Sequence, residues 1–292
     1  MQTEPRTRGT GWKSRFKHTV RRIIPLSLRK PLAVLINHQH WLDADKRGWW
    51  ARQLIADFAE RDRNAYHKFL WRHHLDYAET YEITRRFGYE NFNETRKLFF
   101  KELPSRLRGI GVEPTRDIDS VFEVGCSSGY LLRHMETNVF PAATCIQGND
   151  IDAYAVESGN RLLRELGSRV EIFHADMEQL DELLRDRQYD FMLAAGVLLY
   201  LDQPSAARLV KLMLAHTRKM LAITALAHPE MDNAELRHSV PRERDQTWIH
   251  NVDAMISAAG GRLVARRWEG GKVVDGNTIY FLYAVPPSVS VH

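Results

Sequence analysis

The sequence predicts an α/β protein whose main domain is built on a parallel sheet, and three observations support this. From residue 119 onward, short runs of β-branched and other apolar residues alternate with helical patterns. The first run, at residues 121–124, stops at a turn that begins and ends with glycine, residues 125–129, and a helix-like run follows at once. Acidic residues recur where the predicted strands end, which is where open α/β sheets bind ligands.

Length and composition favour a globular protein of one large domain, or of one domain with an appendage. The chain has 292 residues, of which 44% are hydrophobic and 27% charged. The two cysteines, Cys126 and Cys145, indicate neither a disulfide framework nor a metal cluster and suit the reducing cytoplasm. No apolar run reaches the roughly 20 residues of a membrane span. The apolar stretch near the start is interrupted by prolines and basic residues, which is not typical of a secretory signal. We expect a cytoplasmic protein without a metal site.

The first 40 residues form a basic N-terminal segment. Residues 1–30 hold nine lysines and arginines against the single acid Glu4, a net charge of +8, whereas the whole chain carries +4. Within residues 12–36, apolar side chains such as Trp12 and Phe16 recur at helical spacing between basic ones. This pattern fits a helix on an anionic membrane surface, at the inner face of the membrane. It fits equally a helix that packs on its own domain. Nucleic acid is disfavoured because no recognisable reading module accompanies the charge.

Residues 41–115 predict a helical region rich in aromatic side chains, with helices near 43–61, 63–85 and 93–107. The second helix would carry His73, His74, Tyr77 and Tyr81. These residues either form a lid over the ligand site or pack on the sheet domain with their polar tips in water. The segment from Pro104 to residue 114 is expected to join this region to the third domain, residues 116–292.

The remaining strands are expected at residues 144–148, 170–174, 189–195, 219–226, 262–268 and 278–285, with helices at about 153–166 and 251–259. Asp150 follows the second strand, where its carboxylate can accept hydrogen bonds from both hydroxyls of a ribose. Asp152 competes for that role but suits a helix cap. Asp176 follows the third strand and can accept from an adenine amine, with Met177 against the ring. Glu123 ends the first strand and suits a positively charged ligand better than a pyrophosphate.

The spacing Glu123-x-Gly125-x-x-x-Gly129 departs from the dinucleotide fingerprint G-x-G-x-x-G. It resembles motif I of the class I S-adenosylmethionine (SAM) methyltransferases, and the resemblance extends over about residues 119–226. It implies a Rossmann-like seven-stranded, mostly parallel sheet with a helical N-terminal extension, and SAM as the cofactor. By that resemblance Glu123, Gly125, Gly129, Asp150, Asp176 and Met177 would bind SAM. We expect Cys126, Ser127, Ile151 and Ala195 to complete the cofactor site. If the aromatic helix forms a lid, Tyr77 or Tyr81 would touch the cofactor carboxylate. Cys126 is interpreted as a small filler and not as a nucleophile.

The resemblance also bears on the acceptor. Ala194-Ala195-Gly196 stands where methyltransferases acting on exocyclic amines of bases have an Asn-Pro-Pro-Tyr-like motif, which argues against a nucleic-acid amino methyltransferase. A hydroxyl acceptor needs a general base. His250 is the first candidate, with Asp245 orienting it, His228 is the alternative, and His238 is a weaker one. The competing interpretation is that Thr247 or Asn251 caps the following helix and that the rest of the segment is a solvated loop.

The order of the segments loosely resembles that of methyltransferases of bacterial surface-glycan or deoxysugar pathways. This implies O-methylation of a sugar hydroxyl in glycan or glycoconjugate biosynthesis. Two alternatives stay open: a methyltransferase for a lipid or small natural product, and a non-catalytic SAM-binding or scaffold protein.

Overall fold

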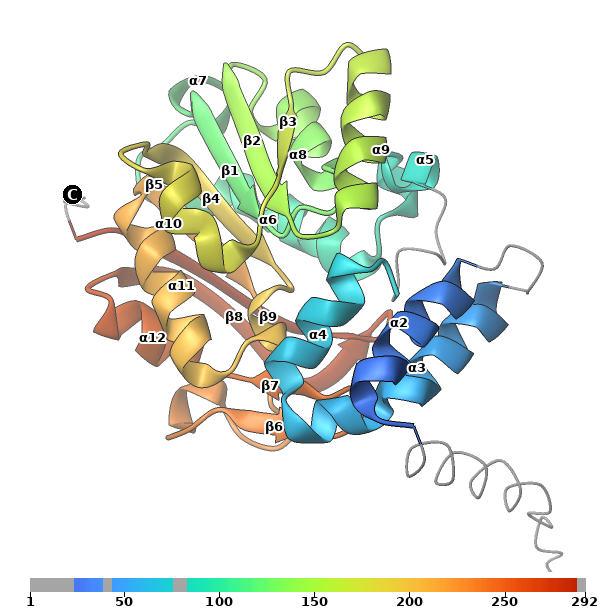
Figure 1. Ribbon diagram of the computed structural model, residues 1–292. Coiled ribbons are helices and arrows are strands. Elements are labelled where there is room, and N and C mark those ends of the chain that lie inside the picture. Colours follow the sequence, from blue (N-terminus) through green and yellow to red (C-terminus); the bar gives the residue numbers. More distant parts are fainter. Residues whose placement is uncertain (1–23, 39–43, 76–82, 288–292) are drawn as a thin grey trace, which may run out of the picture. The chain divides into compact units, whose positions relative to one another are not determined.

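The computed structural model describes residues 24–38, 44–75 and 83–287 (Figure 1). The chain divides into two compact units, residues 1–80 and 81–292. This division differs from the domains predicted from the sequence, which place residues 81–115 with the preceding helices. The two units are described separately below.

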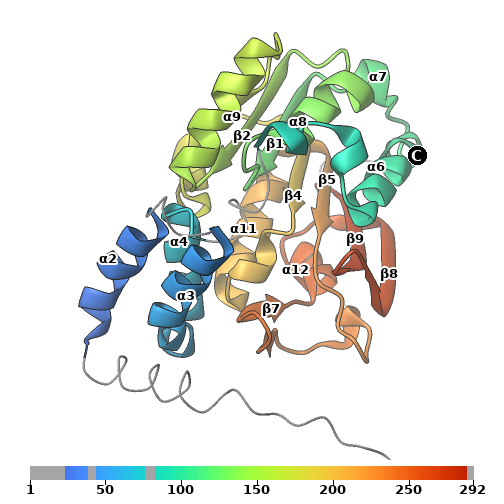
Figure 2. The same cartoon turned by 90° about the vertical axis from the view of Figure 1, so that its right-hand side faces the viewer.

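The described residues of the first unit form the helices α2 (Leu26–Asn37), α3 (Ala44–Arg61) and α4 (Arg63–Arg72). Helix α2 packs along α3, as both views show (Figures 1 and 2). Its buried residues Arg29, Ala33 and Asn37 recur every four positions and so share one face. The predicted helix at 63–85 ends at Arg72 in the structure. Residues 12–23 of the predicted basic helix lie outside the described residues.

The second unit contains all seven predicted strands in one sheet. They are β1 (Ser120–Val124), β2 (Cys145–Asp150), β3 (Glu171–His174), β4 (Tyr189–Ala195), β5 (Thr217–Thr224), β8 (Arg262–Val274) and β9 (Asn277–Val285). The strand order is β3-β2-β1-β4-β5-β9-β8. The first five strands are parallel, and β9 runs antiparallel to both β5 and β8. The mostly parallel sheet is therefore confirmed. A short antiparallel pair that the sequence did not predict, β6 (Val240–Arg242) with β7 (Thr247–Ile249), lies in the segment between β5 and β8.

Strand β8 continues six residues beyond the predicted end at Trp268. The register between β8 and β9 shifts between Trp268 and Val273, and Gly270 there has a φ of 59°. This β-bulge takes up the extra residues around Gly270 and Gly271, and β8 pairs with β9 again beyond it.

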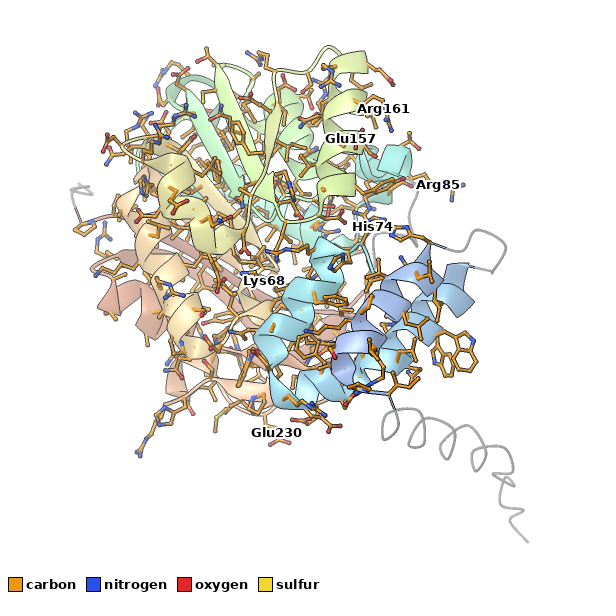
Figure 3. All side chains as sticks on the ribbon, viewed as in Figure 1. Lys68, His74, Arg85, Glu157, Arg161 and Glu230 are labelled. Carbon is orange, nitrogen blue, oxygen red and sulfur yellow. The ribbon has the colours of Figure 1, made fainter. Side chains whose placement is uncertain are left out.

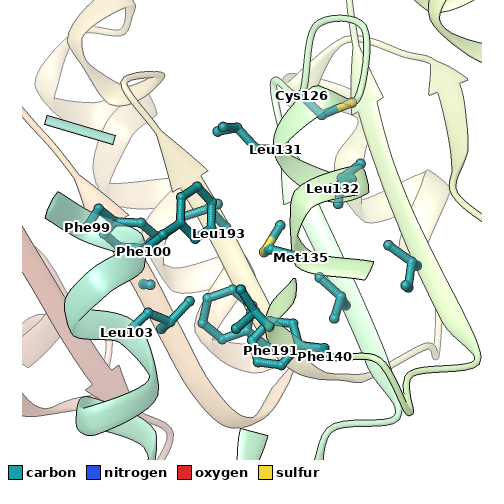
Figure 4. Close-up of a cluster of buried hydrophobic side chains, with 14 of the residues drawn as sticks. Phe99, Phe100, Leu103, Cys126, Leu131, Leu132, Met135, Phe140, Phe191 and Leu193 are labelled. Atoms are coloured by element: carbon teal, nitrogen blue, oxygen red, sulfur yellow. The ribbon is translucent and has the colours of Figure 1, made fainter. Parts of the chain in front are cut away.

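Helices cover both faces of the sheet (Figure 2). One apolar layer joins β-strand residues to α6 (Glu94–Arg108), α8 (Tyr130–His134) and α9 (Ala153–Glu165). Figure 4 shows part of this layer, where Phe99, Phe100 and Leu103 of α6 lie near Phe191 and Leu193 of β4. The second layer joins the opposite face to α10 (Leu180–Leu184), α11 (Gln203–Ala215) and α12 (Val252–Ala258). The shorter helices of this unit are α5 (Ile83–Arg86), η2 (Tyr89–Asn91), α7 (Pro114–Asp117), the π-helix η3 (Met135–Val139), η4 (Met177–Gln179), η5 (Leu198–Tyr200) and η6 (Asn233–Glu235).

Helix α6 belongs to the sheet unit because its aromatic side chains pack on β9. The Phe99 ring stacks on Tyr283 with centroids 5.8 Å apart and meets Phe281 edge to face at 5.6 Å. On the polar side, Glu102 forms an ion pair with Arg267 of β8. These contacts place the end of the first unit before α6, and not at residue 115 as the sequence predicted.

Among the described residues, no helix is long and apolar enough to cross a membrane. The same residues include no cluster of three or more His, Cys, Asp or Glu side chains suited to a metal ion.

Candidate active site

The predicted strand-end residues meet at one edge of the sheet. Glu123, Asp150 and Ala195 lie at the carboxyl ends of β1, β2 and β4, which are adjacent parallel strands. Strand β1 lies between β2 and β4, so the connections leave it on opposite sides at this point. Such a switch in strand order opens a crevice at the carboxyl edge of an α/β sheet.

The loop after β1 needs its glycines for two separate reasons. Gly125 and Gly129 have φ values of 67° and 79°, in the left-handed region that side chains rarely adopt. A Cβ at Gly125 would also lie 2.6 Å from Val197, and one at Gly129 would lie 2.7 Å from Ile172. A third glycine that the sequence analysis did not single out, Gly159 of α9, lets that helix approach the loop closely. A Cβ there would lie 2.4 Å from the backbone oxygen of Ser128.

Asp150 fastens this loop to the end of β2. Its Oδ2 accepts a hydrogen bond of 2.6 Å from the backbone N–H of Ser127, and its Oδ1 accepts one of 2.9 Å from the N–H of Asp152. Burial raises the pKa of Asp150 to about 6 despite these bonds. Because a carboxylate offers about four acceptor positions, each oxygen retains capacity for a ligand hydroxyl. Asp152 is buried and caps α9 by accepting from Ala155 N at 3.1 Å, which confirms the helix-cap alternative.

Glu123 is a buried carboxylate in need of a partner. The residue is 1% exposed, and its Oε2 has no hydrogen-bond partner among the described residues. Burial raises its pKa to about 8, against the lowering effect of the positive charge of Arg96. Burying an unpaired charge is costly, so the carboxyl group holds its proton until something positive compensates it.

Two arginines from the segment before β1 lie at this site, and no sequence motif indicated either of them. Arg96 of α6 lies over the ring of Tyr130, with 5.2 Å between the guanidinium carbon and the ring centroid. Arg86 of α5 donates to Ser127 Oγ at 2.9 Å. Helix α5 packs beside α9, and Figure 3 shows Arg85 of α5 on the side where Glu157 and Arg161 project from α9. The spacing of residues along the sequence does not indicate these arginines. They precede the glycine loop by about 30 and 40 residues and reach it only through the packing of α5 and α6.

The other predicted cofactor residues occupy the same edge. Asp176 is buried, follows β3 and accepts from the N–H of Glu178 at 3.1 Å. Met177 and Ile151 are half-buried beside it along the strand ends. Cys126 is 1% exposed, and burial raises the pKa of its thiol well above the ordinary value. A buried, protonated thiol fits the filler interpretation. Tyr77 lies outside the described residues.

A cavity of about 80 Å³ opens at the ends of β4 and β5. Its polar wall includes Arg96, Thr224 and Thr278, and Ala195 and Gly196 form the strand end beside it. The complete lining is Asn93, Thr95, Arg96, Phe99, Phe100, Leu131, Ala195, Gly196, Leu199, Thr224, Ala225, Leu226, Asn277, Thr278 and Phe281. Two of these hydroxyl groups also support the walls: Thr95 donates to Val274 O at 3.2 Å, and Thr278 accepts from Ala227 N at 2.8 Å.

The predicted arrangement, in which Asp245 orients His250 as a general base, does not form. His250 is 2% exposed, and its two ring nitrogens are engaged by Ser239 Oγ at 2.6 Å and by Leu198 O at 2.9 Å. Burial lowers its pKa. Asp245 instead binds Arg242 and accepts from Thr247 Oγ1 at 2.6 Å. The geometry therefore gives His250 a structural role, and it does not line the cavity.

His228 is also placed unfavourably for a base. Its Nδ1 accepts from the backbone N–H groups of Glu230 at 3.2 Å and Met231 at 3.3 Å, so the neutral ring carries its proton on Nε2. His228 is absent from the cavity lining as well. Asn251 caps α12 by accepting from Ala254 N at 2.8 Å, as the competing interpretation of this segment predicts.

A buried asparagine organises the segment that carries these residues. Asn233 is 0% exposed and donates to Leu226 O at 3.0 Å and to His250 O at 2.7 Å. Its Oδ1 accepts from His228 N and from Trp268 Nε1, both at 2.8 Å. One side chain thus ties the ends of β5 and β7 to β8, and it fixes the wall beside the cavity.

Comparison with known proteins finds a methyltransferase family over the strands that form this site. Residues 121–220 match the model of the family described as a methyltransferase domain. No curated protein matches this chain. Among solved structures, the magnesium protoporphyrin IX methyltransferase of Synechocystis PCC 6803 with bound SAM is similar, with 16% identity and a TM-score of 0.51 over 77% of this chain and 97% of that one. The same protein with S-adenosylhomocysteine (SAH) gives 13% identity and a TM-score of 0.53 over 77% and 100%.

The N-methyltransferase NodS of Bradyrhizobium japonicum WM9 with SAH gives 15% identity and a TM-score of 0.48 over 70% of this chain and 97% of that one. At such identities the likeness to the solved structures concerns the fold. The family match lies on the strands whose ends form the site, from β1 into β5. The chain is therefore a SAM-dependent methyltransferase, and the family match places its methyltransferase domain at residues 121–220.

Proposed function

We propose that SAM binds across the carboxyl ends of β1 to β4 and presents its methyl group to the cavity at β4 and β5. The observation that carries this proposal is the unpartnered, buried carboxyl group of Glu123 beside the glycine loop. SAM carries a sulfonium and an ammonium group, and a cation near Glu123 would compensate the charge that burial disfavours. Gly125 and Gly129 let the loop beside Glu123 keep its left-handed backbone and its close approach to Val197 and Ile172.

Different residues at the carboxyl edge of the sheet would then bind different parts of the cofactor. Asp150 would take the ribose hydroxyls, and Asp176 with Met177 would take the adenine. Cys126, Ser127 and Ile151 would line the nucleoside pocket, and Ala195 would face the methyl group. Arg96 carries a positive charge that lowers the pKa of Glu123, and it would hold the cofactor carboxylate, a role that the sequence suggested for Tyr77 or Tyr81.

Bound SAM supplies an electrophilic methyl group, which an acceptor lone pair attacks as the carbon–sulfur bond breaks and SAH leaves. The chain contributes alignment and exclusion of water, which in favourable cases are worth up to roughly 7–11 kcal/mol. Phe99, Phe100 and Phe281 would exclude water from the cavity, where the acceptor would lie.

For the acceptor we propose a sugar hydroxyl, on a free sugar or a glycan. Asn93, Asn277, Thr224 and Thr278 offer the cavity amide and hydroxyl groups, which match the donors and acceptors of a sugar. The second candidate is a lipid or small natural product, which the three phenylalanines favour. A proton acceptor for the hydroxyl is not assigned to His250, His228 or Asp245, because each is engaged elsewhere.

Two variants separate cofactor binding from acceptor binding. Asp150→Ala should weaken SAM binding at least about tenfold, from loss of charged-group hydrogen bonds worth roughly 1.5–3 kcal/mol. Ala225→Trp should fill the cavity, abolish turnover and leave SAM binding within about twofold. Labelled SAM incubated with cell extracts then identifies the acceptor by whether label enters the glycan or the lipid fraction. Unchanged SAM binding in Asp150→Ala would refute the cofactor site, and full turnover in Ala225→Trp would refute the acceptor cavity.

A further inference from the structure

The first unit presents an apolar face on a helix that is fixed from the opposite side. On α2, Leu28 is 61% exposed and Leu35 is 58% exposed. They are seven residues apart, which is two helical turns, so they lie on the same stripe. Pro31 is also exposed. Large exposed leucines on a helix with a buried opposite face are a feature of interaction surfaces.

Two contacts with α3 fix the rotation of α2. Arg29 is 1% exposed, and its guanidinium binds both carboxylate oxygens of Asp57, at 2.5 and 2.8 Å. Arg29 Nη1 also donates to Leu54 O at 2.5 Å. Lys30 Nζ lies 3.6 Å from the centre of the Phe58 ring, which draws a second basic side chain toward α3. The helix therefore cannot turn its leucines inward without breaking a buried bidentate ion pair.

The positive charge of the residues that precede α2 indicates what kind of partner binds to this face. Residues 1–24 contain seven lysines and arginines and the single acid Glu4. A protein partner with an apolar groove needs no such excess, whereas an anionic lipid surface takes both the apolar side chains and the positive charge. The charged groups of α2 itself, Arg29 and Lys30, are directed toward α3, so the positive charge comes from the residues that precede the helix.

We propose that α2 is an interfacial membrane element, which lies on an anionic bilayer surface with Leu28 and Leu35 in the acyl boundary. This inference does not depend on the identity of the methyl acceptor. It extends the function by placing the enzyme at a membrane surface.

The test is co-sedimentation of the full-length protein with vesicles of phosphatidylcholine alone and of phosphatidylcholine with 30% phosphatidylglycerol. We expect binding to the anionic vesicles only, weakened by raising the salt concentration from about 0.1 to 0.5 M. Leu28→Asp with Leu35→Asp should weaken this binding at least about tenfold. Both side chains are exposed, so SAM binding and the circular dichroism spectrum should not change. The matched control is Leu166→Asp in the second unit, at a leucine that is 45% exposed, and it should bind vesicles as the wild type does.

Three results would overturn the proposal. The first is the absence of binding to anionic vesicles at low salt. The second is equal vesicle binding by the wild type and the double variant. The third is a concentration-dependent dimer that the double variant abolishes while vesicle binding persists, which would assign the face to a second copy of the chain.

Discussion

Replacing Glu123 by glutamine tests the electrostatic basis of the site. Glutamine has nearly the same shape as the protonated carboxylic acid but cannot ionise. In the wild type, the pKa of Glu123 rises from 4.5 to about 8 because the group is buried without a partner. The folded protein therefore holds this proton up to a higher pH than the unfolded chain does.

The magnitude follows from linkage between proton binding and folding. The folded-state pKa is above the unfolded value, so the contribution to stability is complete below about pH 4.5 and is lost as the pH rises toward 8. A shift of about 3.5 units at 1.36 kcal/mol per unit corresponds to a loss on the order of 4–5 kcal/mol. For a domain of about 200 residues, each kcal/mol shifts the Tm by roughly 2–4 °C.

The assay is thermal denaturation of the apo protein at pH values from 5 to 8.5. The wild type should lose at least about 8 °C of Tm over this range relative to Glu123→Gln, whose curve lacks this contribution. A second readout is calorimetry of SAM binding at pH 7 in buffers of different ionisation enthalpy. Wild-type binding should release close to one proton, since a group with a pKa of about 8 is roughly nine-tenths protonated there, and the variant should release none from this group.

Parallel Tm curves for the wild type and Glu123→Gln would refute the assignment of a raised pKa to Glu123. Proton release that persists in the variant would show that another group, such as Asp150, accounts for the linkage. SAM binding by the variant with unchanged affinity at pH 8.5 would show that the ligand cation does not interact with this carboxylate.

Three further predictions concern packing and stability. In Gly159→Ala, the new Cβ would lie 2.4 Å from Ser128 O, so the glycine loop must move and SAM affinity should fall at least about tenfold by calorimetry; affinity equal to wild type would contradict it. His250→Ala removes hydrogen bonds to Ser239 and Leu198, so urea denaturation should show that the free energy of unfolding falls by about 1–3 kcal/mol. Turnover at low temperature and its pH profile should persist. Lost turnover with unchanged stability would restore His250 as a general base. Burial would raise the pKa of Glu136, but hydrogen bonds from its neighbours and the charge of Arg133 lower it to about 2. Glu136 therefore contributes stability at neutral pH that should be lost as the pH falls from about 4.5 toward 2. Glu136→Gln should flatten the acid limb of the curve of Tm against pH, and an unchanged acid limb would contradict this prediction.

The sheet was predictable from the sequence because its strands are buried on both faces. Continuous apolar runs such as Phe191 to Ala195 are typical of central parallel strands, and all seven predicted strands appear near their expected positions. The strand-end acids were predictable for the same reason, since a residue that follows a strand in sequence must lie at its end. The hairpin β6–β7 was missed because Val240–Arg242 and Thr247–Ile249 are too short to carry a period.

Contacts between side chains that lie far apart in the sequence were not predictable. The nearness of Asp245 and His250 in sequence suggested a pair, yet β6 and β7 direct Asp245 to Arg242 and His250 to Leu198. Arg96 reaches the site because Phe99 anchors α6 on β9 through Phe281, which lies about 180 residues further along the chain. Local patterns carry no information about such contacts.

We propose that the nucleoside of SAM lies across the ends of β1 to β4, with its sulfur toward the cavity beside Ala195. A crystal structure of the enzyme with SAH tests it most directly. We expect the ribose hydroxyls on Asp150, the adenine beside Asp176 and Met177, and the sulfur facing the cavity that Ala195 and Thr224 line. Electron density for SAH away from the carboxyl edge of the sheet, or a ribose that does not touch Asp150, would contradict it.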